Sequence, residues 1–234
     1  MNSTISAPEE LLLDHAAGTA GPALDLLIST HLSMSKGSRD LCEMLEAVAG
    51  TFLETMDGEP MALVTAKSVL EAADRDDAGD GDFRQAGHTL SAGAAGMLGA
   101  TPVRYGGCDL PLPLRGLSRN FSDDRQWRRL GAGVAAATLS VPSDQERVHL
   151  LWAKPGCAIA THRHIGREVV LVLKGAFWDE GVRFGPGDIA VGDDGTIHTP
   201  RIDDQEDCIC LAVTEAPVEF VGPFGWLLNR FCRF

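Results

Sequence analysis

The sequence predicts an α + β protein, in which a small N-terminal helical domain precedes a C-terminal jelly-roll β-barrel. Up to about residue 73, apolar residues recur at intervals of three and four, which is the helical period. From residue 101, short apolar runs alternate with Pro, Gly and Asp turns, a pattern typical of β-barrels. We therefore assign residues 1–75 to the helical domain and residues 101–234 to the barrel.

Two short helices are expected first. One covers residues 9–17 after Pro8, and the next begins at Gly21-Pro22 and runs to Leu32. Proline suits the first turn of a helix, because the backbone N–H has no intrahelical partner there.

The third helix has the clearest apolar stripe. It begins with a predicted cap at Ser38 and ends near Gly58. The stripe consists of Leu41, Leu45, Val48, Phe52 and Met56. A fourth helix is expected over residues 61–73. Helices this short cannot bury both sides, so we expect a small bundle or a surface shared with a partner.

Residues 76–100 are expected to form a linker. Five Asp residues lie between positions 74 and 82, around the start of this stretch, and a Gly/Ala-rich segment follows them. The barrel follows. Its candidate strands are residues 127–131, 134–141, 147–153, 168–174, 176–184, 188–191, 197–200, 207–214 and 217–221.

Charge and composition exclude several classes of protein. Residues 1–100 hold sixteen Asp and Glu against five Lys and Arg, so the acidic half is not expected to bind nucleic acid directly. It suits docking against a basic protein surface, although a solvated acidic surface explains the charge as well. The absence of a long apolar run or a signal-like N-terminus predicts a cytoplasmic protein. Six scattered cysteines suggest no disulfide framework.

Four residues of the barrel have the spacing of a single-metal site: His162, His164, Glu168 and His198. Histidines at alternate positions of a strand face the same side, and Glu168 can return to the same pocket. An isolated His-x-His pair is usually structural, but glycines and strand-like runs flank both segments here. We expect one divalent metal per chain, zinc being favoured, while iron(II), manganese and nickel suit the same ligands.

The two segments resemble both motifs of the cupin superfamily. Over almost the whole chain, the sequence is also similar to the ChrR-like anti-sigma factors, which have a helical domain, a linker and a cupin. The residues that carry this resemblance include Thr30-His31-Leu32-Ser33, Leu150-Leu151-Trp152, Val172-Leu173-Lys174-Gly175-Ala176-Phe177, Phe184-Gly185-Pro186-Gly187-Asp188-Ile189, His198-Thr199-Pro200 and Asp207-Cys208-Ile209-Cys210-Leu211-Ala212.

This resemblance implies that the helical domain binds an extracytoplasmic-function-type sigma factor and that the cupin takes part in an oxidative stress response. Anti-sigma domains of the family bind zinc through an early His and a His-x3-Cys-x2-Cys run. In this chain the run is His31-x3-Ser35-x2-Ser38, and Ser6 stands at the early His position. A serine hydroxyl is a poor zinc ligand. We therefore predict a zinc-free helical domain, in which His31 packs or lies on the surface, and a metal in the cupin alone.

Two alternatives stay open at this stage. The cupin ligands suit an iron(II) dioxygenase that cleaves a small diketone or aromatic substrate, since open coordination positions remain for substrate and oxygen. A non-catalytic module that binds a metal or a small molecule is the second. Cupins often pair through their sheets, so a homodimer is a further expectation.

Overall fold

The computed structural model of the chain describes residues 7–58, 104–105, 108–115, 117, 127–131, 133–143, 146–222, 225 and 229. The predicted fourth helix and the predicted linker lie outside these residues. The predicted boundary at residue 75 therefore stays a prediction. The described helical residues up to Gly50 and the barrel belong to one compact unit.

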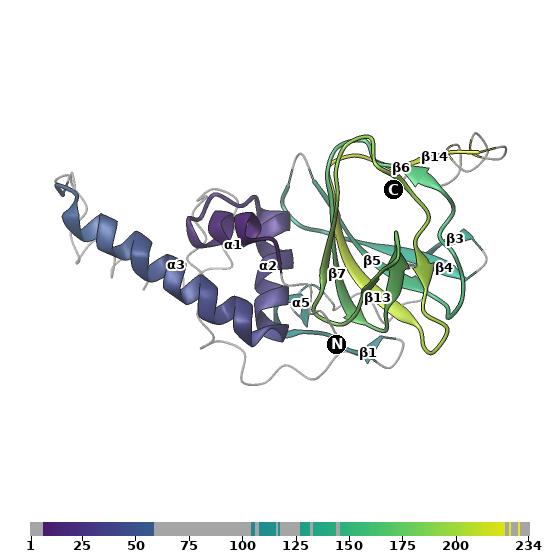
Figure 1. Cartoon of the computed structure of the whole chain (residues 1–234), viewed down its shortest axis with the longest axis horizontal. Helices are drawn as coiled ribbons and strands as arrows, with labels where there is room; N and C mark the ends of the chain where they lie inside the picture. Colours follow the sequence, from purple (N-terminus) through teal and green to yellow (C-terminus); the bar gives the residue numbers. More distant parts are fainter. Residues whose placement is uncertain are drawn as a thin grey trace, which may run out of the picture. The chain divides into compact units, whose positions relative to one another are not determined.

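The first three predicted helices are present: α1 (Glu9–Ala16), α2 (Pro22–Met34) and α3 (Lys36–Thr55) (Figure 1). Helix α3 begins earlier than predicted. The Ser35 hydroxyl accepts a 3.3 Å hydrogen bond from the Ser38 amide, so Ser35 occupies the N-cap position. Ser38 is the third helical residue.

Strands and one short helix make up the rest of the described chain. The elements are β1 (Arg104–Tyr105), β2 (Cys108–Asp109), α5 (Leu112–Arg115), β3 (Arg128–Gly131), β4 (Val134–Leu139), β5 (Arg147–Ala153), β6 (His162–Arg163), β7 (Glu168–Lys174), β8 (Phe177–Asp179), β9 (Val182–Phe184), β10 (Ile189–Gly192), β11 (Ile197–His198), β12 (Arg201–Ile202), β13 (Cys208–Thr214) and β14 (Glu219–Phe220).

The barrel is built from antiparallel sheets. A six-stranded sheet has the order β10-β7-β13-β5-β4-β3, and two three-stranded sheets have the orders β11-β6-β14 and β12-β8-β9. β1 and β2 form a separate pair. The fold class predicted from the sequence is confirmed: helices come first, and an antiparallel cupin-like barrel follows.

Two of the predicted strands are divided. Residues 176–184 form the hairpin β8–β9, because Glu180 and Gly181 both have positive φ, 47° and 82°, and make a two-residue turn. The strand predicted over 197–200 ends at His198, and the chain pairs again in β12 beyond Pro200. Proline has no N–H to donate to a ladder, which is consistent with the break.

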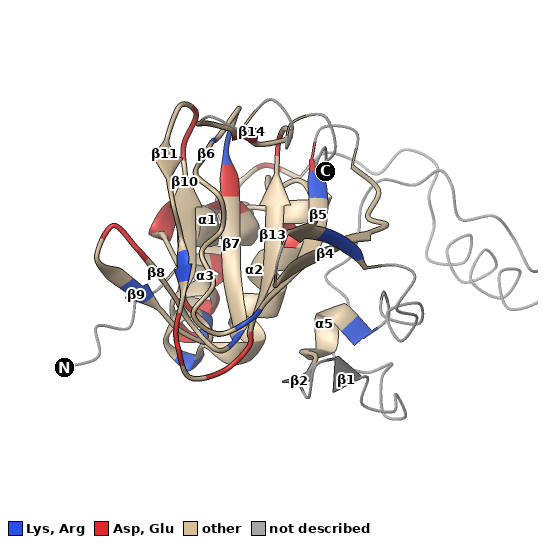
Figure 2. Ribbon diagram, turned by 90° about the vertical axis from the view of Figure 1, so that its right-hand side faces the viewer, with Lys and Arg blue, Asp and Glu red and all other residues tan. Residues whose placement is uncertain are grey.

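The two faces of the six-stranded sheet have different neighbours: one packs against helices, and the other faces the barrel interior. On β7, Val169, Leu171 and Leu173 belong to a core cluster that also contains Leu27 and Ile28 of α2. Figure 2 shows α1 and α2 behind β7 and β13, which carry few charged residues along their length. The opposite face of β7 is turned into the barrel, where Glu168 and Val170 line a cavity. The same strand therefore supports the helices and lines the barrel interior.

Helix α3 leaves most of its apolar stripe uncovered. Leu41 and Leu45 pack against the core, whereas Val48, Phe52 and Met56 are 52%, 69% and 67% exposed. The helix is therefore amphipathic, as predicted, but much of its apolar face is in solvent. Among the described residues, no helix has both the length and the apolar character needed to cross a membrane.

Candidate metal centre

Strand pairing places two of the four predicted ligands opposite each other. β6 and β11 are antiparallel, and His162 and His198 are direct partners in this register. Directly opposed side chains on one face of a ladder lie close together. His162 is 5% exposed, so its ring is within the barrel.

The backbone around β6 and β11 also fixes His164. Its amide donates to the Thr196 carbonyl at 3.0 Å, and its carbonyl accepts from the Gly195 amide at 3.0 Å. Gly192 gives the ring its space, because a Cβ at this position would lie 2.9 Å from His164 Nε2. Glu168 reaches the same place from the first position of β7.

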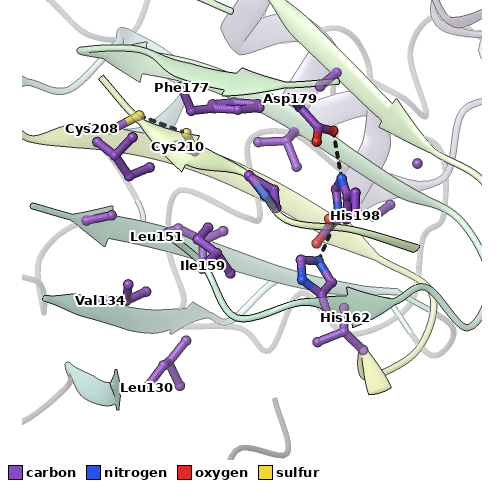
Figure 3. Close-up of a pocket in the computed structure, with 18 of the residues that line it drawn as sticks. Leu130, Val134, Leu151, Ile159, His162, Phe177, Asp179, His198, Cys208 and Cys210 are labelled. Carbon is purple, nitrogen blue, oxygen red and sulfur yellow. Dashed lines mark hydrogen bonds and ion pairs between the residues drawn. The ribbon is translucent and has the colours of Figure 1, made fainter. Parts of the chain in front are cut away.

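The four predicted side chains converge. One ligand atom from each of His162, His164, Glu168 and His198 lies within 4.8 Å of the others. Within the described part of the chain, this is the one cluster of His, Cys, Asp and Glu with a metal-binding arrangement. His198 Nε2 lies 2.9 Å from His162 Nε2 (Figure 3). It lies 2.8 Å from His164 Nε2.

The hydrogen bonds of two rings show that this arrangement fits a cation. His162 Nδ1–H donates to the Ala160 carbonyl at 2.9 Å, and His198 Nδ1–H donates to the Asp179 carboxylate at 2.7 Å. Each neutral ring then has its lone pair on Nε2. Two lone pairs face each other at 2.9 Å, which is repulsive unless a positive charge stands between them. A metal ion held between the rings would supply that charge, as would a proton on one of the two nitrogens.

The protonation of the cluster also suits a metal. Burial lowers the pKa of the His162 and His164 imidazoles to about 4, so both are neutral near pH 7. Burial raises the pKa of the Glu168 carboxyl to about 7. A buried carboxyl with no cation nearby is stabilised as the neutral acid. A divalent ion would reverse this preference by pairing with the carboxylate.

Asp179 is a residue of the site that the sequence did not reveal. It ends β8, and its carboxylate orients the His198 ring so that Nε2 points at the cluster (Figure 3). Carboxylates commonly hold metal-binding histidines in this way. In the sequence, Asp179 precedes Glu180-Gly181 and looks like an ordinary turn residue. Only its approach to His198, nineteen positions away, reveals its role.

A cavity of about 90 Å³ adjoins the cluster. Its walls are apolar and include Leu151, Val170, Phe177 and Ile202. Among the described residues that line it there is no Lys or Arg, and its acidic groups are Glu168 and Asp179. Such a cavity suits a small uncharged molecule.

Cys208 and Cys210 lie on the wall of this cavity, at a distance from the histidines (Figure 3). Their sulfur atoms are 3.6 Å apart, and both residues are buried in the barrel core. The hydrogen bond with the Cys208 thiol, followed by burial, raises the pKa of Cys210. The Cys210 thiol is therefore protonated near neutral pH.

The residues at the family's zinc positions in the helical segment are hydrogen-bonded to one another. His31 Nε2 lies 2.7 Å from the Ser38 hydroxyl, and Ser38 Oγ is 3.0 Å from Ser35 Oγ. His31 is 1% exposed, so of the two predicted roles it packs in the interior. Ser6 lies outside the described residues. His31 has no second strong zinc ligand among its described partners, and its nitrogens are satisfied by hydrogen bonds.

The cluster in the barrel offers three nitrogens and one carboxylate oxygen on one side of an open cavity. With a divalent ion bound, these donors would leave coordination positions free toward the cavity, where the ion could act as a Lewis acid or hold a small ligand. The protein residues themselves orient the rings and line the cavity with apolar walls, and burial keeps the His162 and His164 imidazoles neutral.

Comparison with known proteins places the chain in a family. Residues 119–218 match the family described as the ChrR cupin-like domain. The anti-sigma-E factor ChrR of Cereibacter sphaeroides is 35% identical over 226 residues, which cover 96% of each chain. The crystal structure of Rhodobacter sphaeroides SigE in complex with the anti-sigma ChrR also matches. Its TM-score is 0.66 and its identity 35%, and the match covers 90% of this chain and 98% of that one.

The similarity is not confined to the barrel, because it spans both the helical segment and the cupin. A relative this similar over this share of both sequences shows common membership. The chain belongs to the ChrR family of anti-sigma factors.

Proposed function

We propose that the protein is a ChrR-type anti-sigma factor, which binds an extracytoplasmic-function-type sigma factor through its helical segment and a divalent metal through its cupin. One observation carries this proposal: the 35% identity to an anti-sigma factor extends over 96% of both chains. A shared cupin alone would support only the fold.

The helical segment has a surface that suits a protein partner. Met44, Val48, Phe52 and Leu53 of α3, and Met56 directly after its end, are all more than half exposed. Asp40, Glu43, Glu46 and Glu54 occupy other positions of the same helix. An exposed apolar row with acidic neighbours is typical of a helix that docks into an apolar groove with a basic rim. We assign this row as the sigma-binding surface.

The metal is proposed to lie among His162, His164, Glu168 and His198. The facing lone pairs and the buried carboxyl support this assignment, and zinc is the ion that three imidazoles and a carboxylate suit best. We expect the metal and its cavity to receive the inducing signal, an oxidant or a small ligand.

Binding of the purified full-length chain to the purified sigma factor tests the proposal. Isothermal titration should give a stable complex, and Phe52→Asp should weaken it about thirtyfold or more, as expected for an apolar anchor. Val182→Asp is the matched control, because Val182 is an exposed apolar residue on β9, within the barrel. Equal affinities for wild type, Phe52→Asp and Val182→Asp would exclude α3 as the binding surface.

A cupin dioxygenase remains a second candidate, because an apolar cavity opens beside the four ligands. In that case, iron(II)-loaded protein would consume oxygen in the presence of a small diketone, and zinc-loaded protein would not. Absence of turnover in both forms, with metal bound, leaves the regulatory function.

A further inference from the structure

We propose that His31 is a positioning residue, which holds the first turn of α3 against the barrel. It does so through a chain of hydrogen bonds that all run in one direction, from the Ser35 hydroxyl to the Gly187 carbonyl. The proposal rests on the proposed function in one respect: α3 is taken to be the helix that binds the sigma factor. The chain of hydrogen bonds itself joins α2, α3 and the turn between β9 and β10.

The direction of the chain follows from its acceptor at the barrel. His31 Nδ1 lies 2.8 Å from the Gly187 carbonyl oxygen, which can only accept, so Nδ1 carries the proton. In the neutral ring, Nε2 is then an acceptor, and the Ser38 hydroxyl donates to it at 2.7 Å. Ser38 Oγ in turn accepts from the Ser35 hydroxyl at 3.0 Å.

Because the hydrogen-bonded side chains are buried, their hydrogen bonds matter for the position of α3. His31 is 1% exposed and Ser38 is 2% exposed, so water cannot replace a lost partner without a change in packing. Burial also lowers the pKa of His31, which keeps the ring in the neutral form that the chain requires. Ser35 and Ser38 lie at the start of α3, so the chain acts on the first turn of that helix.

The barrel end of the chain is well anchored. Gly187 donates its amide to the Val172 carbonyl at 2.8 Å, and Val172 donates to the Asp188 carbonyl at 3.0 Å. The Asp188 carboxylate accepts from the Gly185 amide at 2.7 Å and closes the turn. Val172 belongs to β7, the strand that begins with Glu168. His31 therefore connects the start of α3 to the strand that carries a candidate metal ligand.

Two substitutions disrupt this series of hydrogen bonds in different ways. His31→Phe keeps an aromatic ring and deletes both hydrogen bonds of His31, whereas Ser38→Ala keeps the bond to Gly187 and removes the hydroxyl that joins His31 to Ser35. His31→Asn is the conservative variant, because its amide nitrogen can stand near Nδ1 and keep the bond to Gly187. Leu27→Ala is the control, since Leu27 is fully buried on the same helix and has no part in the chain.

Amide hydrogen exchange of the free full-length protein is the deciding measurement. In His31→Phe and Ser38→Ala, the first turn of α3 should exchange faster than in wild type by about tenfold, the equivalent of one net hydrogen bond. Amides of β7 and β13 should keep their relative protection, and metal content should be unchanged. The Gly187 turn should loosen in His31→Phe and recover in His31→Asn. Leu27→Ala should lower protection throughout the core without selecting the first turn of α3.

Sigma-factor affinity is the second readout, and it should fall about tenfold in His31→Phe. Wild-type exchange at the first turn of α3 in both His31→Phe and Ser38→Ala would overturn the proposal. If the wild-type chain binds no sigma factor, the proposed function fails, and the exchange data still decide the role of His31. If exchange changes while affinity does not, His31 holds the first turn of α3 as proposed, and the result counts against α3 as the helix that binds the sigma factor.

Discussion

At the scale of single residues, the candidate metal centre depends on how each histidine is oriented. His162 and His198 each have Nδ1 engaged, by a carbonyl and by the Asp179 carboxylate, so both present Nε2 to the same point. The spacing in the sequence predicted the four residues that the structure brings together, whereas the groups that orient them could be found only in three dimensions. Asp179 is the clearest case.

Replacing the Asp179 carboxylate tests this orienting role. Asp179→Asn should weaken metal binding by about 10- to 100-fold, because a neutral amide holds the His198 ring less firmly and lowers its basicity. Competition with a chromogenic chelator measures the change. Glu180→Gln removes a neighbouring carboxylate outside the cluster and should have no effect. Unchanged affinity in Asp179→Asn would show that the His198 ring is held by other groups.

His149 gives the barrel a dependence on pH that is separate from the metal. It is 2% exposed on β5, and burial, followed by the charge of Arg147, lowers its pKa to about 4. In the unfolded chain its pKa is about 6.5. Between these values the unfolded state holds a proton that the folded state lacks, so the free energy of unfolding rises with pH across this window.

His149→Gln should flatten that dependence. The slope of the free energy of unfolding between pH 4 and pH 6.5 should fall by up to about 1.4 kcal/mol per pH unit, the value for one proton. Above pH 6.5 His149 is neutral in both states, and its contribution should be constant. Urea unfolding at a series of pH values measures both ranges. Equal slopes for variant and wild type would contradict the buried neutral state of His149.

At the scale of elements, the sequence predicted most of the barrel and three helices, because local signals define them. The helical period of α3 and the continuous apolar runs of β7 and β13 are visible in the sequence. The hairpin β8–β9 was missed because its two-residue turn contains Glu180, a residue that seldom adopts positive φ. The contact between His31 and Gly187 joins positions 156 residues apart, and no local pattern indicates it.

The close approach of the His164 ring explains why a glycine, Gly192, stands at the end of β10. A Cβ at Gly192 would lie within 3.2 Å of three atoms of the His164 ring. Gly192→Ala should therefore displace His164 and weaken metal binding by about tenfold or more. Gly195→Ala is an informative comparison, since its Cβ would meet no atom within 4 Å but its φ of 81° would be strained. Chelator competition should rank Gly192→Ala as the more damaging change for metal affinity, and the reverse order would contradict this role.

At the scale of the whole molecule, one sheet connects the two functional parts. α2 packs on the outer face of β7 and β13, and the inner face of β7 carries Glu168. The helices are covered by the barrel on one side, while the apolar row of α3 is exposed. This arrangement gives a change at the candidate metal centre a short structural route to the base of α3, the helix proposed to bind the sigma factor.

The number of bound metals follows from the same arrangement. Purified protein should contain one divalent ion per chain, because the cupin cluster has four suitable donors and His31 is hydrogen-bonded to serine. Elemental analysis should show close to none in His162→Ala or His198→Ala, and no loss in His31→Ala. Two ions per chain in the wild type would contradict the zinc-free helical segment.

Transcription in a purified system tests the central claim most directly. RNA polymerase loaded with the sigma factor should lose sigma-dependent transcription when an equimolar amount of the full-length chain is added first. The double variant Val48→Asp/Phe52→Asp should not inhibit, and transcription from the primary sigma factor should be unaffected. Full sigma-dependent transcription in a large excess of folded, metal-loaded wild-type chain would contradict the assignment as an anti-sigma factor.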